Sequence, residues 1–139
     1  MSLTVSVRLG QPVEEAADTY LATTGWSKTA LINTALNEWL RMQSHPGVRF
    51  VPTPAGDRIA ALVRGPAVWT VAESWNQHDE RDRTVDNVTA STGLTRAEVD
   101  IALGYYADHT AEIDAQIARV HRAQTIAREA WERRQALHG

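Results

Sequence analysis

The chain has 139 residues, of which 43% are hydrophobic and 22% charged, and its formal net charge is −3. This length fits one modest domain or two small ones with a real hydrophobic core. Cysteine is absent, which excludes disulfides and thiolate metal sites. No run approaches the ~20 apolar residues that span a bilayer, and no basic and apolar leader begins the chain, so we expect a soluble cytoplasmic protein with no membrane partner.

Charge is distributed unevenly along the chain. Residues 1–43 carry three basic and four acidic side chains, residues 44–109 carry six and nine, and residues 110–139 carry five and four. No segment is strongly basic. A nucleic-acid contact would therefore have to be local and doubled by symmetry, because a broad positive face is lacking.

The N-terminal stretch LTVSVRL alternates apolar and polar residues, a pattern typical of a strand with one buried face. One face would carry Leu3, Val5, Val7 and Leu9, and the other Thr4, Ser6 and Arg8. No nearby segment resembles a pairing partner, and a lone strand leaves its backbone groups unpaired. Either the partner strand comes from a second chain, or this is an edge strand of an ordinary α+β domain.

Two helices are predicted after the strand. Pro12 suits the first turn of the first helix, and Gly25 suits its end. Ser27 is the predicted N-cap of the second helix, WSKTALINTALNEWLRM. This second helix has two apolar stripes, one of Leu31, Ala35, Trp39 and Met42 and one of Ile32, Leu36 and Leu40. So broad an apolar surface indicates packing on its own chain and also on a second molecule.

The stretch VRLGQPVEEAADTYLATTG followed by WSKTALINTALNEWL resembles the ribbon-helix-helix family of DNA-binding proteins. In that family the N-terminal strands of two subunits pair antiparallel and enter the major groove. The resemblance implies a DNA-binding and dimerisation domain over residues 1–43. Its implied dimerisation residues are Val5, Val7, Leu9, Leu31, Ile32, Leu36 and Trp39. It also implies that Thr4, Ser6 and Arg8 read base edges and that Ser27 and Lys28 hold a phosphate; a simple helix cap is the alternative role of Ser27.

A second domain is expected over residues 45–109, after SHPGVRFVPTP breaks the second helix. Strands at 48–51 and 58–64 around the turn PAGD would form a hairpin. A helix opening at Gly65-Pro66 would bury Val68, Val71, Ala72 and Trp75, followed by a solvated loop, HDERDR. Next come a helix from Thr84 to Gly93 and a helix with a Thr95–Glu98 capping box, whose predicted buried stripe is Val99, Ala102, Leu103 and Tyr106.

The helix, glycine turn and helix between Thr84 and Tyr106 also fit a helix-turn-helix with the hairpin as its wing. Acidic residues on the presumptive recognition helix would repel phosphate, which favours a compact helical domain over a second DNA contact. The motifs HPG, G-x-x-V-W and YY-x5-EIDA resemble a small winged-helix-like domain of bacterial antitoxins. Its fusion to a DNA-binding N-terminus resembles VapB-type antitoxins of type II toxin–antitoxin operons, which implies a PIN-type ribonuclease toxin as partner.

One long helix, ~40 Å in length, is predicted from Thr110 to about Leu137. Its coiled-coil-like seam is Ile113, Ile117, Val120, Gln124, Ala127 and Trp131. This helix, residues 110–139, could fold back on its own domain. Alternatively it docks on a partner through Ile117, Val120, Arg128, Trp131 and Arg134, because Trp and Arg are favoured interface anchors.

The sequence shows no motif that indicates enzyme activity. The five histidines lack metal-ligand spacing, and no phosphate loop or nucleophile elbow is present, so neither a catalytic residue nor a metal or cofactor is expected. The expected fold is mainly α with a short β-ribbon, a winged-helix-like α+β domain and a C-terminal helix. The expected function is an antitoxin and repressor that binds double-stranded operator DNA as a homodimer or dimer of dimers. The alternative is a homo-oligomeric DNA-binding regulator or interaction module without a toxin.

Overall fold

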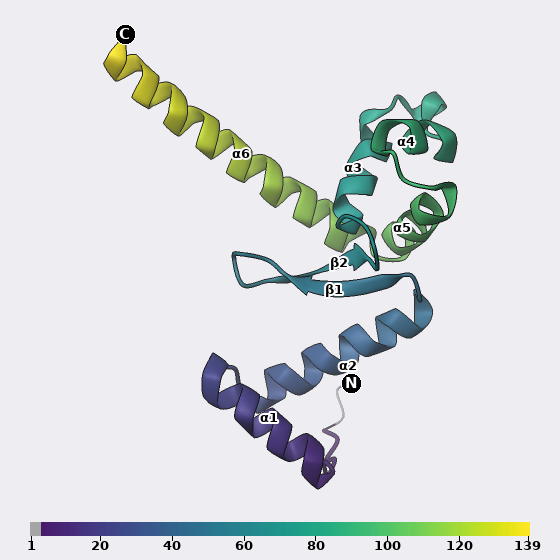
Figure 1. Cartoon of the computed structure of the whole chain (residues 1–139), viewed down its shortest axis with the longest axis vertical. Helices are drawn as coiled ribbons and strands as arrows, with labels where there is room; N and C mark the ends of the chain where they lie inside the picture. The colour runs from purple at the N-terminus through teal and green to yellow at the C-terminus, as the bar shows by residue number, and fades with distance from the viewer. Residues whose placement is uncertain (1–3) are drawn as a thin grey trace. The chain divides into compact units, whose positions relative to one another are not determined.

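The computed structural model describes residues 4–139, and the chain divides into two compact units, residues 1–41 (unit 1) and 42–139 (unit 2). The described chain is mainly helical, with one two-stranded antiparallel sheet and a long C-terminal helix (Figure 1). This composition of elements confirms the coarse fold class that the sequence predicted.

Unit 1 contains an extended segment, α1 (Gln11–Thr24) and most of α2 (Lys28–Ser44). α1 ends at Gly25, whose φ of 73° is the left-handed conformation that glycine adopts without strain. The Ser27 hydroxyl oxygen accepts a hydrogen bond from the Ala30 amide at 3.1 Å, which confirms the predicted cap of α2. Residues 4–10 have no regular secondary structure in the single chain, and Leu3 lies outside the described residues. Pairing of this segment with a second chain stays a prediction.

The sheet of unit 2 is the predicted hairpin. β1 (Val48–Pro52) pairs antiparallel with β2 (Arg58–Leu62), with Val48 opposite Leu62. Gly56 supplies a φ of 93° in the connecting turn. β2 ends at Leu62, two residues earlier than predicted, because the Leu62 amide donates to the Pro66 carbonyl at 3.0 Å in the turn that leads to the next helix.

Three helices follow the hairpin: α3 (Val68–Gln77), α4 (Val85–Thr92) and α5 (Arg96–Asp108), with a short 3-10 turn, η1 (Glu80–Asp82), before α4. The Thr84 side chain caps α4, and Thr95 and Glu98 form the capping box of α5. Hydrogen bonds from the backbone and then the side chain of Thr95 hold the pKa of the Glu98 carboxyl below its usual value. Both predicted helix starts are therefore confirmed.

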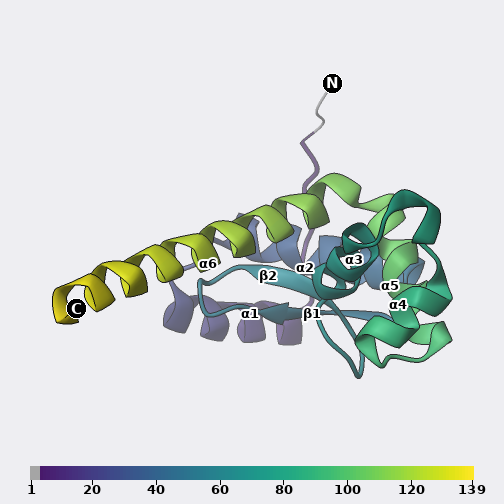
Figure 2. The same cartoon turned by 90° about the horizontal axis from the view of Figure 1, so that it is seen from above.

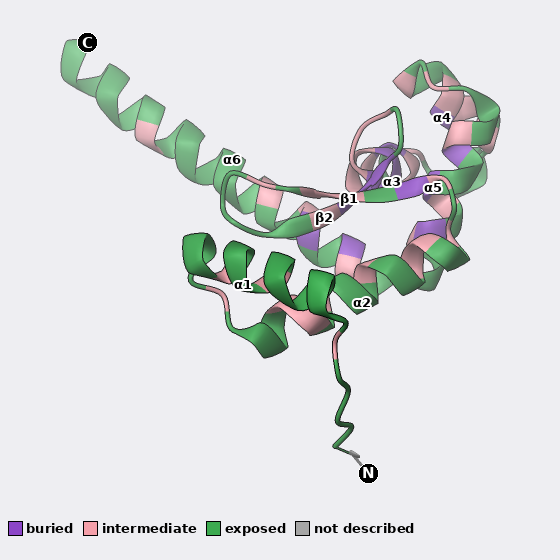
Figure 3. Cartoon of the chain, turned by 60° about the horizontal axis from the view of Figure 1, so that its bottom comes forward, coloured by how far each residue is buried: buried purple, intermediate pink, exposed green. Residues whose placement is uncertain are grey.

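The hydrophobic core lies between the hairpin and the helices of unit 2 (Figure 3). Its buried members are Val48, Ala60, Leu62, Val68, Val71, Ala72, Val88, Val99, Ala102, Tyr105 and Ile113. Tyr105 is the largest of the fully buried side chains, whereas Trp75, Leu103 and Tyr106 only pack against the edge of the core. The buried face of α5 is therefore centred near Ala102 and extends to Tyr105, whereas the predicted stripe ended on Tyr106.

The long helix α6 (Thr110–His138) begins where the sequence predicted and contributes to this core. Ile113 is fully buried and Gln116 is nearly so, and Ile117 packs against the cluster. The core thus continues past residue 109, where we had placed a domain boundary. The outer part of α6 extends beyond the other elements of unit 2 (Figure 2).

Ile113→Ala should lower the free energy of unfolding of unit 2 by about 2–5 kcal/mol, because it empties a fully buried site. Ile126→Ala makes the same change on the same helix where the side chain is 64% exposed. That control should change the free energy by less than about 0.5 kcal/mol. Urea unfolding followed by circular dichroism measures both, and equal effects would contradict the placement of the core.

Candidate functional site

Burial differs sharply between the two units. None of residues 4–41 is buried, and every buried residue of the described chain lies in unit 2. α1 and α2 contain no buried side chain, although α2 carries the two apolar stripes that the sequence predicted. Short helices in water are marginal without tertiary packing. A single copy therefore leaves unit 1 without the buried core that would hold it together.

Most of the exposed large apolar side chains of unit 1 line one groove of about 810 Å³, called here the apolar groove; Trp39 and Leu40 lie outside it. Its lining is Val5, Ser6, Val7 and Leu9 of the extended segment, Val13, Ala16, Ala17 and Tyr20 of α1, and Leu31, Ile32, Ala35 and Leu36 of α2. Val5 and Val7 are 77% and 75% exposed. The groove brings together every predicted dimerisation residue except Trp39, which is 56% exposed one turn further along α2.

The polar side chains of the extended segment are less cleanly separated than the alternation predicts. Thr4, Ser6 and Arg8 are all exposed. Ser6 and Arg8 line a second hollow of about 600 Å³, which Glu14 and Lys28 also border. Because Ser6 also lines the apolar groove, only Thr4 and Arg8 among the predicted base-reading residues stay clear of it.

Two acidic side chains lie next to the predicted phosphate site at the start of α2. The Lys28 Nζ atom lies 3.9 Å from Glu14 Oε1 and 3.7 Å from Asp18 Oδ1, both on α1. The Ser27 hydroxyl oxygen is engaged as the helix cap. A phosphate here would compete with two carboxylates for Lys28. The sequence signal was available, because residues 14 and 18 are four apart and share one face of α1.

In unit 2 the basic residue of the presumptive recognition helix is already paired. Arg96 on α5 forms an ion pair with Asp86 on α4, and both side chains are exposed. The hairpin turn is likewise engaged, because Asp57 Oδ2 lies 3.4 Å from Arg119 Nη1 on α6. These contacts agree with the interpretation of this region as a compact domain.

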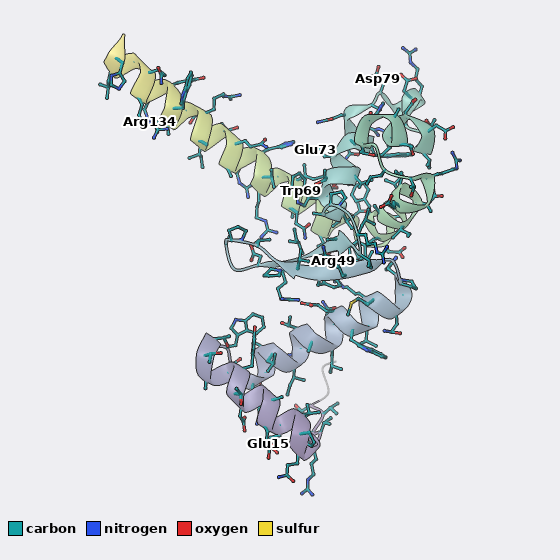
Figure 4. The ribbon with its side chains drawn as sticks, in the orientation of Figure 1. Glu15, Arg49, Trp69, Glu73, Asp79 and Arg134 are labelled. Carbon is teal, nitrogen blue, oxygen red and sulfur yellow. The ribbon has the colours of Figure 1, made fainter. Side chains whose placement is uncertain are left out.

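The predicted partner-binding residues fall into two groups along α6. Ile117 packs on the core of its own unit, and Val120 is half-buried. Residues 122–138, called here the outer arm, carry Arg128, Trp131 and Arg134; Figure 4 labels Arg134 far out on the helix. Trp131 is 54% exposed, and two apolar side chains outside the predicted partner-binding set, Ile126 and Leu137, are 64% and 85% exposed. The exposed apolar surface of α6 therefore belongs to the outer arm.

Metal clusters and membrane-spanning helices are both absent from the residues that the structure describes. Within residues 4–139, no group of three or more His, Cys, Asp or Glu side chains is placed to hold a metal ion. None of the helices in this same range has the length and apolar character needed to cross a bilayer.

Comparison with protein-family models, with curated proteins and with solved structures finds no match to this chain.

Val7→Asp tests whether a second copy closes the apolar groove. A carboxylate buried there without a partner costs several kcal/mol, so the dimer dissociation constant should rise about 100-fold or more. Thr4→Asp adds the same charge to the same segment outside the groove and should leave dimerisation nearly unchanged. Sedimentation velocity over a concentration series measures both. Wild-type sedimentation of Val7→Asp would show that the groove is not the dimer interface.

Proposed function

We propose that the chain is a dimeric DNA-binding repressor of the ribbon-helix-helix type, and that it acts as the antitoxin of a type II toxin–antitoxin system. One observation carries the proposal. The N-terminal unit has no buried residue among those described, yet it presents an apolar groove lined by its extended segment and both helices. An antiparallel ribbon between two copies would pair the backbone of the segments and cover Val5 and Val7 together.

DNA recognition in this proposal rests on the outward side of the paired ribbon. A two-stranded ribbon fits the major groove, and Arg8 can bond a guanine in bidentate fashion while Thr4 contacts either base type. Unit 1 has a net negative charge, and Lys28 is paired with acids. Affinity would therefore come from a few contacts doubled by the dimer rather than from a broad positive surface.

Partner binding in this proposal rests on the outer arm of α6. Its exposed Trp131, with Arg128 and Arg134 nearby in the sequence, has the composition of an interface anchor. Arginine forms bidentate pairs with carboxylates. The partner would be a PIN-type ribonuclease, whose metal-binding carboxylates could accept these arginines. The winged-helix-like domain in unit 2 would serve as the scaffold that carries the arm.

A second candidate is a homo-oligomeric interaction module in which DNA contact is lost. The observation that favours it is the pairing of Lys28 with Glu14 and Asp18, which weakens the predicted phosphate site. Assembly that is insensitive to salt and independent of DNA would support this candidate. Co-expression with the product of the adjacent reading frame, followed by size exclusion, separates the two.

Arg8→Ala should cost ~1–3 kcal/mol per specific base contact and relax sequence preference. Lys28→Ala should instead weaken binding to all sequences alike and reduce the salt slope. Fluorescence anisotropy with the DNA upstream of the gene, and with a scrambled duplex, at several salt concentrations distinguishes these outcomes.

A different outcome of the same titrations would place the DNA-binding surface on unit 2. If Arg8→Ala keeps full affinity and specificity while Arg96→Ala abolishes binding, α5 reads the DNA and the ribbon proposal is wrong. Circular dichroism of both variants, run beside the titrations, separates a lost contact from a lost fold.

Truncation after Arg122 should leave folding and dimerisation intact but abolish retention of the co-expressed neighbouring protein. A cut at residue 109 is unsuitable, because it would remove buried Ile113. Trp131→Ala should weaken the complex by at least about 2 kcal/mol if it is a hot spot. Glu129→Ala is the control, since residues two apart lie on opposite faces of a helix. Wild-type retention of the neighbouring protein by the truncated chain would contradict the assignment.

A further inference from the structure

The inner part of α6 presents a narrow buried stripe to the core. Ile113, Gln116 and Ile117 form this stripe, and the helices against which it packs are α3 and α5. A stripe of three side chains resists separation of the helices but resists rotation of α6 about its own axis only weakly. Polar contacts lie on both sides of this stripe.

On one side of the stripe lie Glu112 and Arg119, which are seven residues apart and therefore on one face of the helix. The hydroxyl of fully buried Tyr105 donates to Glu112 Oε2 at 2.7 Å. Two turns further along, Arg119 donates to Asp57 Oδ2 at 3.4 Å. This side of α6 is thus tied first to α5 and then to the hairpin turn.

On the other side lie Asp114 and His121, which are again seven residues apart. The Tyr106 hydroxyl donates to Asp114 Oδ1 at 2.6 Å and accepts from Asn76 Nδ2 of α3 at 3.0 Å. His121 Nε2 contacts the Glu73 carboxylate, and Figure 4 labels Glu73 on α3. This side is thus tied first to α5 and then to α3.

We propose that Glu112, Asp114, Arg119 and His121, together called here the α6 clamp, are positioning residues that hold the outer arm in one fixed direction. Two contacts on each side of the buried stripe oppose rotation of α6, and their spread over two turns opposes swinging. The outer arm begins at residue 122, directly after the last clamp residue. The clamp residues lie outside the outer arm, so they affect docking only by fixing the direction in which the arm points.

The clamp has a consequence for whatever docks on the outer arm. An isolated helix of this length is marginal in water, because its first turn must be nucleated. The outer arm continues the clamped turns of α6, and these turns supply the nucleus. A partner therefore binds a helix that is already formed and fixed in direction. Preorganisation of this kind raises affinity by reducing the entropy lost on binding. Only this consequence rests on the proposed function; the fixed direction of the arm does not.

Distances between spin labels in the full-length protein test the clamp. The chain has no cysteine, so Ala90→Cys on α4 and Ala136→Cys on the outer arm give two unique labelling positions, both exposed. Dilution with unlabelled chain suppresses distances between copies. The labelled wild type should give one narrow distance distribution. Tyr106→Phe combined with His121→Ala removes contacts on one side and should at least double its width.

Rescue and control variants separate a positioning role from general destabilisation. Asp114→Ala should broaden the distribution, whereas Asp114→Asn keeps an oxygen that accepts from Tyr106 and should restore the wild-type width. Glu80→Gln changes an exposed carboxylate of unit 2 outside the clamp and should have no effect. If the Tyr106 double variant fails to fold, Asp57→Ala with Glu73→Ala removes the two outer contacts without changing α6. Unchanged widths in Asp114→Ala and in the Tyr106 or Asp57 double variant would overturn the proposal.

The titration of Tyr106 provides an independent readout. Burial, and next the hydrogen bond to Asp114, raise the pKa of Tyr106 above its usual value. The folded state therefore keeps this proton longer than the unfolded state, and the stability it contributes is lost as pH rises through the folded pKa. Asp114→Asn removes the nearby charge and should lower the pKa of Tyr106 in an ultraviolet titration. No change would show that the two side chains are not in contact.

Binding of the co-expressed neighbouring protein distinguishes failure of the clamp from failure of the proposed function. Broader distances with about tenfold weaker binding in the Tyr106 double variant would support the clamp and its consequence for docking. Broader distances where even the wild type binds nothing would support the clamp and overturn the antitoxin role. Full affinity with broader distances would support the clamp and overturn its consequence for docking.

Discussion

The uneven burial of apolar side chains is the constraint on which the rest of this molecule depends. Every buried residue of the described chain lies in unit 2, around Tyr105, while residues 4–41 contain none. Hydrophobic burial is the dominant favourable contribution to folding. Unit 2 therefore has a core of its own, whereas unit 1 has an apolar groove that needs a covering surface. The proposal of a dimer follows from this difference.

Ion pairs within the chain limit which basic side chains can contact DNA. Lys28 lies between two carboxylates of α1, and Arg96 is paired with Asp86. Exposed pairs of this kind contribute little to stability, but each lowers the positive potential that a phosphate would meet. Arg8 on the extended segment thereby becomes the principal candidate for sequence recognition. In α6 the polar contacts are proposed to fix the orientation of the helix, because they flank a buried stripe on both sides.

The sequence by itself determined the features that depend on neighbours within one helical turn or one hairpin. Gly25 ends α1, Ser27 caps α2, and Thr95 caps α5 through local backbone geometry that needs no distant contact. The hairpin and the start of α6 followed from turn residues and apolar periodicity. The predicted dimerisation residues other than Trp39 line one groove, because apolar residues at regular spacing share one face of a helix.

Only the tertiary structure decided which of two adjacent tyrosines enters the core, since periodicity gives the face of a helix but not the angle at which its neighbours pack. Tyr105 is fully buried and Tyr106 lies at the edge, bonded to Asp114. The same holds for Ile113, which belongs to the core because α3 and α5 meet α6 there. These outcomes depend on contacts between elements far apart in the chain, whose relative placement no local pattern encodes.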